Sequence, residues 1–343
     1  MKALVFYGAG DIRYVDVETP EPKQGEVLIK VKAVSICGSD LNGYRGKSPF
    51  RVPPLIMGHE FSGEIAKLGE GVKGINVGDR VIVETNLYCG DCPNCKAGFI
   101  NICENRRIIG TTMKAGSYNG AMAEYVVAPA NKVIKLPDNV SFNAAALIEP
   151  LANVLRAVKH VGSLEGKEVA VYGAGPIGLL TVMSAKYYGA KRVFAMEVLD
   201  NRLQMAKECG ADVIINPNRE KASEVVRKMT NDAGADVVFD AVGFAETVKD
   251  SAQMVRNGGT VIWIGLGATT VDIDYKMAVA RELCFKGTYM YITEMIEGLE
   301  ILKSGKMDVE KIITGVYPLS EGPRIFEELA SGKSKDIKVI LYP

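Results

Sequence analysis

Short stretches of strand-like residues, separated by turns, make up the first part of the chain. Residues 1–7 predict a strand, in which successive side chains point to opposite faces. Residues 27–34 form a second strand-like stretch after a turn rich in proline and glycine. Residues 43–54 predict a loop, residues 58–65 predict the start of another strand, and residues 78–83 predict a turn followed by a strand. This part of the chain therefore favours β structure.

From about residue 150 the pattern changes to near-continuous apolar strands that alternate with helices. Such strands, joined by helical crossovers, predict a doubly wound parallel sheet and an α/β fold class. The strands are expected at 168–172, 192–196, 213–215, 235–240, 260–265 and 284–289. Helices are expected at 179–188, 295–302 and 322–330, followed by a last strand at 337–341.

Length and composition limit the kind of protein this is. A chain of 343 residues exceeds the roughly 250–300 residues that one core usually holds, so two domains are expected. Its 41 Lys and Arg residues balance 41 Asp and Glu residues, which gives no field that would attract nucleic acid or a membrane surface. The sequence shows neither a membrane-spanning stretch nor a secretion signal. We expect a cytoplasmic protein without nucleic-acid or membrane partners.

Four cysteines within a short segment are the strongest local signal. They follow the spacing C-x2-C-x2-C-x7-C, and four thiolates so arranged can close a tetrahedron around one zinc ion without leaving an open position. A disulfide-bonded or buried cluster is the alternative, and a zinc ribbon for nucleic acid is disfavoured because the flanks carry no large basic excess. The predicted ligands of this structural zinc are Cys89, Cys92, Cys95 and Cys103.

A glycine-rich turn lies between a predicted strand and a predicted helix. Residues 173–178 follow the pattern G-x-G-x-x-G, and the acidic Glu197 ends the next strand. In this context the glycines let a pyrophosphate approach the helix N-terminus, while the carboxylate accepts hydrogen bonds from ribose hydroxyls and repels a 2′-phosphate. The pattern predicts a dinucleotide site that prefers NAD to NADP. The alternative is a glycine turn beside a solvated glutamate.

A second group of possible metal ligands is dispersed along the chain. Cys37 lies in the stretch Cys-Gly-Ser-Asp, and His59 and Glu60 follow about twenty residues later. Catalytic zinc sites typically use three protein ligands and keep one position open. Each of these residues alone would more often be an ordinary core or surface residue, and the other motifs make the metal hypothesis stronger.

Taken together, these motifs resemble those of medium-chain, zinc-dependent alcohol dehydrogenases along the whole chain. The signature G-H-E-x2-G-x5-G-x2-V runs from Gly58 to Val72, after the Cys-Gly-Ser-Asp box. Within the family, the chain resembles the polyol branch of sorbitol and galactitol-1-phosphate dehydrogenases, and less closely threonine dehydrogenase. The resemblance implies a groES-like, β-rich catalytic domain from residues 1–150 and 293–343, with the structural-zinc lobe at 86–104. It also implies a Rossmann NAD-binding domain at 151–292.

The resemblance also implies how the catalytic zinc is held. Cys37 and His59 would bind it together with Glu60 or Glu149, either directly or through water. Glu149 stands where many alcohol dehydrogenases have a second cysteine, and a salt-bridged loop carboxylate is the alternative for it. Asp40 would orient the ring of His59.

The catalytic chemistry implied by the family is hydride transfer from an alcohol carbon to the nicotinamide of the cofactor. Ser39 would accept the hydroxyl proton and pass it on, since serine is too weak a base to keep it. In the family the relay continues to a histidine, which is Asn42 here, so the exit of the proton stays open and includes water as an alternative.

Further residues would contact the cofactor by resemblance to the family. Lys338, in the last strand, matches a basic residue that contacts the pyrophosphate, with a solvated lysine as the alternative. The full set of expected cofactor residues is Gly173, Gly175, Pro176, Ile177, Gly178, Glu197, Arg202, Gly265, Leu266, Tyr289, Met290 and Lys338.

The substrate is predicted only as a class. Sorbitol dehydrogenases carry Phe-Arg-Tyr where this chain has Tyr289-Met290-Tyr291, and the loss of the arginine favours the galactitol-phosphate relatives. Tyr44 and Arg45 are candidates to line the pocket or bind a phosphate, with a surface loop residue as the alternative for Arg45.

We predict an NAD-dependent zinc dehydrogenase that converts a secondary alcohol, such as a polyol, a sugar alcohol or its phosphate, into a ketone. L-Threonine 3-dehydrogenase and 2,3-butanediol dehydrogenase activities are alternatives. A zinc-independent, NADPH-using quinone-reductase relative and a non-catalytic regulator that binds NAD and zinc are further alternatives. The family implies a homodimer or homotetramer.

Overall fold

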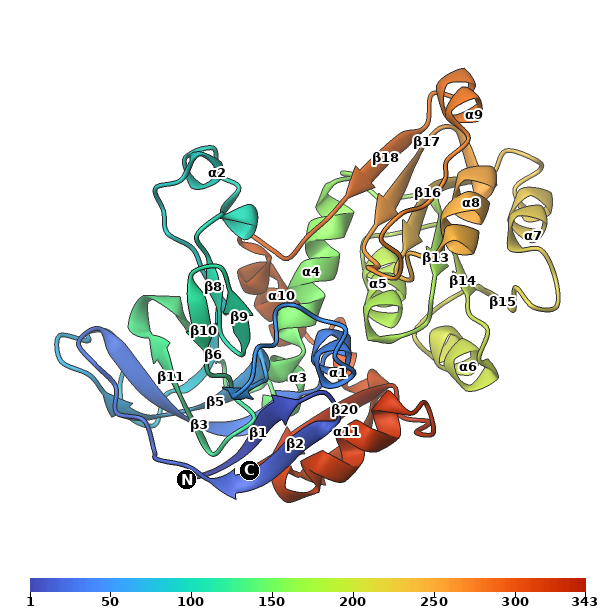
Figure 1. The fold of residues 1–343 in the computed structure, drawn as a ribbon. Helices are drawn as coiled ribbons and strands as arrows, with labels where there is room; N and C mark the ends of the chain where they lie inside the picture. Colours follow the sequence, from blue (N-terminus) through green and yellow to red (C-terminus); the bar gives the residue numbers. More distant parts are fainter. The chain divides into compact units, whose positions relative to one another are not determined.

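The computed structural model describes residues 1–343 and divides into two compact units. The first unit is formed by Met1–Glu149 together with Met295–Pro343, and the second by Pro150–Glu294. The chain passes between the units within two helices, α4 (Ile148–Lys159) and α10 (Glu294–Lys303). Figure 1 shows the elements of both units.

A seven-stranded sheet is the centre of the first unit. Its strands run in the order β12-β6-β5-β3-β20-β19, and β11 also pairs with β3. Their bounds are β3 (Glu26–Ser35), β5 (Glu60–Leu68), β6 (Arg80–Val83), β11 (Tyr125–Pro129), β12 (Val133–Lys135), β19 (Ile313–Pro318) and β20 (Lys338–Tyr342). Because β20 pairs with β3, the last strand of the chain joins the N-terminal strands (Figure 1).

Smaller elements complete the first unit. A three-stranded sheet has the order β2-β1-β4, and two-stranded sheets join β7 to β8 and β9 to β10. The strands are β1 (Lys2–Gly8), β2 (Asp11–Asp16), β4 (Leu55–Ile56), β7 (Asn86–Leu87), β8 (Arg107–Ile108), β9 (Thr111–Met113) and β10 (Gly116–Tyr118). The helices are α1 (Gly38–Tyr44), α2 (Pro93–Lys96), α3 (Phe142–Ala146), α11 (Gly322–Ala330) and the 3-10 turns η1 (Ile100–Ile102), η2 (Ala130–Lys132), η3 (Val309–Ile312) and η4 (Leu319–Glu321).

The core of the first unit forms because β-branched and aromatic residues of β3 and β5 share one cluster with α11. Ile29, Phe61 and Ile65 are buried there, and Ile325 and Phe326 of α11 join them. Burying such a side chain contributes about 1.5–3 kcal/mol. The docked α11 thus brings the C-terminal segment, with β20, onto the N-terminal strands.

Three glycines let separate backbone segments approach closely just before His59. Gly58 adopts φ +99°, and an added Cβ there would lie 2.9 Å from the backbone nitrogen of Met122. A Cβ on Gly110 would lie 2.7 Å from the carbonyl oxygen of Gly58, and one on Gly120 would lie 2.5 Å from that of Met57. No side chain fits in this crossing, so the glycines fix the backbone from which His59 projects.

The second unit is a six-stranded sheet whose order is β15-β14-β13-β16-β17-β18, and every pairing in it is parallel. Its strands are β13 (Glu168–Tyr172), β14 (Arg192–Met196), β15 (Val213–Ile215), β16 (Ala235–Asp240), β17 (Val255–Trp263) and β18 (Cys284–Gly287). Its helices are α5 (Pro176–Tyr187), α6 (Asp200–Glu208), α7 (Ala222–Met229), α8 (Ala245–Met254) and α9 (Tyr275–Ala280). Right-handed crossovers place α5 and α6 on one face and α7 and α8 on the other.

The predicted combination of a β-rich groES-like part and a doubly wound parallel sheet is confirmed. Three local expectations were wrong or incomplete. The loop expected from residue 43 begins inside α1, β17 begins five residues before the expected position, and β18 ends at Gly287. Helix α4 was not predicted at all. None of the helices is both long and apolar enough to cross a membrane.

Candidate functional site

Helix α1 begins at Cys37 because the local sequence supplies a complete cap. The Cys37 sulfur accepts a hydrogen bond from the backbone N–H of Ser39, and the Asp40 carboxylate accepts one from the backbone N–H of Cys37. The reciprocal pair satisfies two helix-end donors, and an acidic residue in the first turn also suits the helix dipole. The cap holds the Cys37 sulfur at the start of the helix, shortly after the end of β3.

Three predicted ligands of the catalytic zinc come together in the structure. The donor atoms of Cys37, His59 and Glu60 all lie within 4.8 Å of one another. The antiparallel pairing of β3 with β5 sets Ser35 opposite Glu60, and this register brings the two dispersed motifs side by side. We call Cys37, His59 and Glu60 the three-ligand group.

The chemistry of the three-ligand group suits a cation. Burial, with the carboxylates of Glu60 and Asp40 close by, raises the pKa of the Cys37 thiol to about 12. A thiol and carboxylates crowded in one place disfavour one another's charged forms, whereas a divalent metal ion deprotonates a coordinating thiol outright. Sulfur, nitrogen and oxygen donors in this combination fit zinc.

The carboxylate of Glu60 is held by two buried partners. The Ser35 hydroxyl and the Lys338 ammonium both donate to it, and Lys338 Nζ also donates to the carbonyl of Ile36 at 3.1 Å. Lys338 is only 2% exposed, so the alternative of a solvated lysine is wrong. Burial alone would lower the pKa of Lys338, but the charges of Glu60, Cys37 and Glu149 and the hydrogen bond to Glu60 together raise it.

Glu149 lies in the first turn of α4, which makes it a helix residue and not a loop carboxylate. It is buried, and its charge acts on Lys338. It does not belong to the three-ligand group, so Glu60 is the carboxylate that the structure brings to Cys37 and His59.

A buried arginine that the sequence analysis did not single out lies beside this group. Arg51 donates to Asp40 Oδ1 from Nε at 3.1 Å and from Nη2 at 2.7 Å, and Nη2 also reaches Ser39 Oγ at 3.1 Å. Asp40 Oδ1 lies 3.6 Å from His59 Nδ1, which is close enough for an electrostatic contact but too long for a hydrogen bond. No sequence signal marks Arg51, because it lies in the segment expected to be a loop.

The four predicted structural ligands also meet. The sulfurs of Cys89, Cys92, Cys95 and Cys103 lie within 4.8 Å of one another. Cys89 and Cys103 are 3.5 Å apart and Cys92 and Cys103 are 3.9 Å apart, whereas zinc–sulfur bonds of about 2.3 Å in a tetrahedron place the sulfurs about 3.8 Å apart. The cluster therefore has the dimensions of a closed zinc site.

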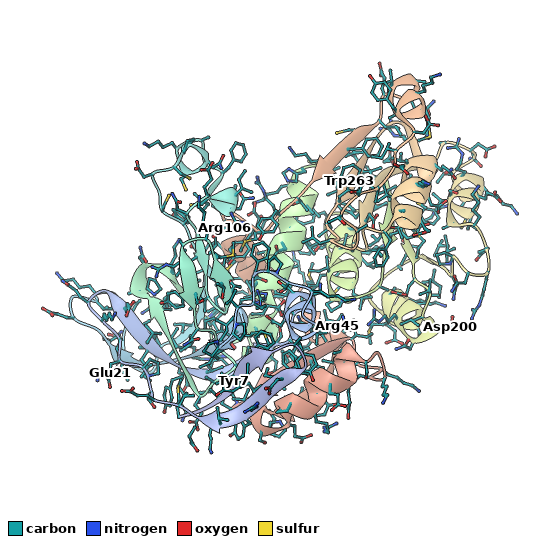
Figure 2. All side chains as sticks on the ribbon, in the orientation of Figure 1. Tyr7, Glu21, Arg45, Arg106, Asp200 and Trp263 are labelled. Atoms are coloured by element: carbon teal, nitrogen blue, oxygen red, sulfur yellow. The ribbon has the colours of Figure 1, made fainter.

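The β7–β8 pair closes the base of the lobe that carries these cysteines. Arg106 Nη1 donates to the carbonyl of Cys103 at 2.7 Å, and Figure 2 labels this arginine at the lobe. Backbone N–H groups of Asp91 and Cys92, and then the thiol of Cys103, lower the pKa of Cys89 to about 6. Burial raises the pKa of Cys95 to about 12.

In the second unit, the glycine turn has the shape of a dinucleotide cradle. Gly173 follows β13 and adopts φ +87°, and a Cβ on Gly178 would lie 2.7 Å from the carbonyl carbon of Gly173. Pro176 begins α5 at a position where a missing N–H costs nothing, and Ile177 follows it. Above Gly175 the nearest atom to an added Cβ is Arg202 Nη1 at 3.9 Å. This open space between a helix N-terminus and a guanidinium suits a pyrophosphate.

Glu197 follows β14 and is tied to the glycine turn. Its carboxylate accepts hydrogen bonds from the backbone N–H of Ala174 at 3.0 Å and of Val198 at 2.7 Å. The bonds fix the carboxylate at the carboxyl end of the strand, next to the glycine turn, where a parallel sheet binds the ribose of a dinucleotide.

The other predicted cofactor residues of the second unit also follow strands. Gly265 and Leu266 come after β17, and Leu266 is 83% exposed. Tyr289 and Met290 come after β18, and Met290 adopts φ +51°. Non-glycine residues in this region cost about 1–3 kcal/mol and cluster at binding sites. All of these residues therefore lie beyond the carboxyl ends of parallel strands, the edge at which such sheets bind ligands.

Tyr44 and Arg45, which were candidates for the pocket, have other contacts. The ring of Tyr44 packs 5.7 Å from that of Phe326. Arg45 donates to the last carbonyls of α11, from Nε to Ala330 at 3.1 Å and from Nη2 to Leu329 at 3.2 Å (Figure 2). Both contacts support a structural role for these residues.

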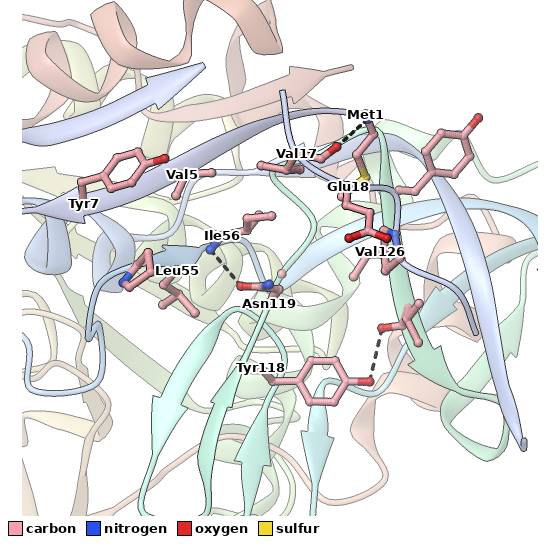
Figure 3. A pocket seen from close by; sticks show the side chains of 15 residues that line it. Met1, Val5, Tyr7, Val17, Glu18, Leu55, Ile56, Tyr118, Asn119 and Val126 are labelled. Atoms are coloured by element: carbon pink, nitrogen blue, oxygen red, sulfur yellow. Dashed lines mark hydrogen bonds between the residues drawn. The ribbon is translucent and has the colours of Figure 1, made fainter. Parts of the chain in front are cut away.

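A cavity of about 410 Å³ lies elsewhere in the first unit. Tyr7, Leu55, Tyr118 and Val126 are among the residues that line it, and Figure 3 shows Asn119 bonded to Ile56 at its wall. It contains none of the predicted site residues, and its lining is mostly apolar, so size alone does not identify the reactive site.

Two family patterns match the chain. Residues 23–138 match the alcohol dehydrogenase GroES-like domain, and residues 176–304 match the zinc-binding dehydrogenase family. The first contains the three-ligand group and the four-cysteine lobe, and the second contains the glycine turn from Pro176 and the strands that follow it.

Individual proteins are similar over nearly their full length. D-Arabitol-phosphate dehydrogenase of Enterococcus avium is 36% identical over 97% of this chain and 94% of its own. L-Threonine 3-dehydrogenase of Pyrococcus furiosus is 38% identical over 99% of this chain and 97% of its own. The structure of a zinc-binding dehydrogenase from Sinorhizobium meliloti 1021, bound to NADP, superimposes with a TM-score of 0.94 at 32% identity, covering 100% of this chain and 99% of that one.

Proposed function

Since the chain belongs to the medium-chain, zinc- and NAD(P)-dependent alcohol and polyol dehydrogenases, we propose that it oxidises a secondary alcohol of a polyol, a sugar alcohol or its phosphate to the ketone. The observation that carries the proposal is the three-ligand group with the exposed hydroxyl of Ser39 next to it. This arrangement combines a metal site made of three protein ligands with a hydroxyl group that is able to accept a proton.

Zinc held by Cys37, His59 and Glu60 would supply Lewis acidity that lowers the pKa of an alcohol, with hydride accepted by the nicotinamide cofactor. The chain itself contributes the proton path. Ser39 Oγ accepts the hydroxyl proton and releases its own once the O–H has turned away from Cys37 Sγ, to which it donates at 3.2 Å. Asn42 is exposed and has no basic atom, so we propose that water receives the proton from Ser39.

We propose NAD as the preferred cofactor. The support is Glu197, whose carboxylate is bonded to the glycine turn and, if it faces the adenosine ribose, would repel a 2′-phosphate. The similar Sinorhizobium meliloti structure is bound to NADP, so the preference has to be measured on this chain. Cofactor contacts are proposed for the same residues that the sequence indicated, including Lys338, although its ammonium also pairs with Glu60.

The substrate proposal rests on the residues after β18. Met290 stands where sorbitol dehydrogenases carry an arginine, which favours a relative of the phosphorylated-polyol enzymes. D-Arabitol-phosphate dehydrogenase is among the similar proteins, and so is L-threonine 3-dehydrogenase, which keeps threonine as the second candidate. We also propose that the protein forms a homodimer or homotetramer. The edge strand β18 is unpaired on one side and could pair with a strand of a second copy.

The test is turnover by purified, zinc-loaded protein, followed as NADH formation. Sorbitol, xylitol, galactitol, arabitol, their phosphates, 2,3-butanediol and threonine are compared, each with NAD and with NADP. We expect a polyol or polyol phosphate to give the highest kcat/KM, and NAD to exceed NADP. In the matched variant Glu197→Ala, the ratio of kcat/KM with NAD to kcat/KM with NADP should fall. The order of preference among the substrates should stay unchanged.

Other outcomes separate the alternatives. Highest turnover with threonine or 2,3-butanediol would replace the polyol proposal with that activity. Two bound zinc ions and bound NAD without any turnover would instead support a regulator. Turnover that persists after removal of zinc, with NADPH preferred, would indicate a quinone-reductase type of enzyme.

A further inference from the structure

A single buried guanidinium connects two side chains on α1 that have different predicted roles. The side chain of Arg51 is 3% exposed and that of Asp40 is 0% exposed. Arg51 donates to Asp40, to Ser39 Oγ and, from Nη1 at 3.2 Å, to the carbonyl of Phe50. It therefore contacts the predicted proton acceptor and the carboxylate beside His59 at the same time.

Stability alone does not explain a charge at this position. Removing a guanidinium and a carboxylate from water costs several kcal/mol per ion, and apolar residues of similar volume often replace such a pair without loss of stability. What the pair provides is direction, because the planar guanidinium presents its N–H groups in a fixed fork. All three nitrogens of that fork donate hydrogen bonds, and Nη2 is shared between Asp40 and Ser39.

A glycine in helix α1 leaves space for the aliphatic part of the Arg51 side chain. Gly43 is buried inside this helix, and an added Cβ would lie 2.9 Å from the Cβ of Arg51 and still closer to its Cγ. Glycine inside a helix costs about 1 kcal/mol relative to alanine. The helix thus carries a less favourable residue at the point where Arg51 passes.

We propose that Arg51 is a positioning residue for the dehydrogenase reaction, acting through Ser39 and Asp40. The inference rests on the proposed function and names a residue that orients its reactive groups. Arg51 occupies one lone pair of Ser39 Oγ, while the Ser39 hydroxyl donates to Cys37 Sγ at 3.2 Å. The remaining lone pair of Ser39 is left for the substrate hydroxyl.

The same guanidinium holds Asp40 against the ring of His59. Oδ1 of Asp40 is fixed by Arg51 and lies 3.6 Å from His59 Nδ1, while Oδ2 accepts from the backbone N–H of Cys37 at 3.3 Å. Groups that orient a metal-binding histidine typically change metal affinity or activity 10- to 100-fold when removed. Arg51 therefore affects both zinc binding by the three-ligand group and the orientation of Ser39.

The test compares Arg51→Met with Arg51→Lys in the full-length protein and uses two readouts. Chelator competition measures zinc affinity at both zinc sites, and steady-state kinetics with the best substrate of the panel separates kcat from KM. For Arg51→Met we expect zinc affinity at the three-ligand group to fall about 10- to 100-fold, with the four-cysteine site unchanged. We expect kcat to fall by a similar factor, with KM changed less than about threefold.

Lysine separates the two contacts of Arg51. An ammonium is a point charge that can pair with Asp40, but it lacks the fork that also reaches Ser39. Compared with Arg51→Met, Arg51→Lys should therefore regain most of the zinc affinity at the three-ligand group. Its kcat should stay below that of the wild type. Gly43→Ala, which displaces the arginine without changing any charge, should reduce kcat in the same direction by a smaller factor.

Arg281→Met in the second unit is the control, because Arg281 is partly buried and, like Arg51, donates to a backbone carbonyl, that of Ala252 at 2.7 Å. It should change neither zinc affinity nor kcat by more than about twofold. The proposal is wrong if Arg51→Met keeps both quantities near their wild-type values, or if both zinc sites weaken together with overall stability. Wild-type protein without zinc at the three-ligand group would overturn the proposed function as well.

Discussion

The four-cysteine lobe and the three-ligand group collect their metal ligands in opposite ways. The lobe takes all four sulfurs from one short segment, which the β7–β8 pair closes. The three-ligand group takes Cys37 from the start of α1 and His59 and Glu60 from the start of β5, and Lys338 from β20 supports them. One site depends on local spacing, and the other depends on the register of the main sheet.

The two sites also differ in what surrounds them. Around the lobe, Tyr88, Phe99 and Ile102 are exposed, so little apolar core exists there apart from the cysteines. Around the three-ligand group, the buried pairs Arg51–Asp40 and Lys338–Glu60 fill the space. We therefore expect the lobe to need its metal in order to fold, whereas the other site is held by the sheet and needs its metal for chemistry.

The largest effect is expected when a ligand of the three-ligand group is removed. Cys37→Ala should lower kcat/KM at least about 1,000-fold, since Lewis-acid catalysis supplies several kcal/mol and each 1.4 kcal/mol is a factor of ten. NAD affinity and thermal stability should change little. Full activity with two zinc ions bound would show that Cys37 is not a ligand.

The exposed Cys284 of β18 provides the control for this substitution. Cys284→Ala removes a thiol that belongs to neither cluster, so turnover and zinc content should stay at wild-type values.

The reverse pattern is expected in the lobe. Cys92→Ser should lower the free energy of unfolding by more than about 3 kcal/mol, because a structural zinc contributes folding energy. Chemical denaturation and zinc analysis measure the effect, with Cys284→Ser as control. At a temperature where the variant is folded, its kcat should remain within about threefold of wild type, and a specific loss of kcat would contradict the division of roles.

The thiols of metal-free protein offer a third contrast. The pKa of Cys89 is about 6, whereas that of Cys37 is about 12. As pH rises through 6, Cys89 becomes a thiolate and its alkylation accelerates, while Cys37 remains protonated. At about pH 7 we expect alkylation of Cys89 to be on the order of 100-fold faster than that of Cys37. This figure allows for the lower nucleophilicity of the thiolate of an acidic thiol. Mass spectrometry of alkylated peptides gives both rates.

Equal alkylation rates at Cys89 and Cys37 would contradict the different surroundings described for the two sites. Zinc added before the reagent should protect both residues, and this protection would confirm that each thiol is a ligand.

Sequence predicted the parts of the molecule that depend on short-range patterns. The parallel strands of the second unit, the glycine turn and the grouping of four cysteines follow from periods and spacings within a few residues. The resemblance to a family then associated Cys37 with His59 and Glu60, and the structure brings their donor atoms together.

The missing parts depend on contacts between distant segments. Arg51 lies in a stretch whose sequence is typical of a loop. Its role becomes visible only in the structure, where its side chain donates to Ser39 of α1. The pairing of Lys338 with Glu60 depends on β20 joining β3, which no local pattern encodes. Helix α1 is short and contains two glycines, so helix propensity argues against it, and the cap at Cys37 and packing overrule that propensity.

The glycine crossing before His59 has a consequence for engineering this enzyme. Gly58, Gly110 and Gly120 leave no room for a side chain, so a library that randomises them would return misfolded variants and hardly any new specificities. Diversity is better placed at Asn42, which is exposed on α1, or at the residues after β18. New substrates can thus be explored there while the backbone that presents the metal ligands stays constant.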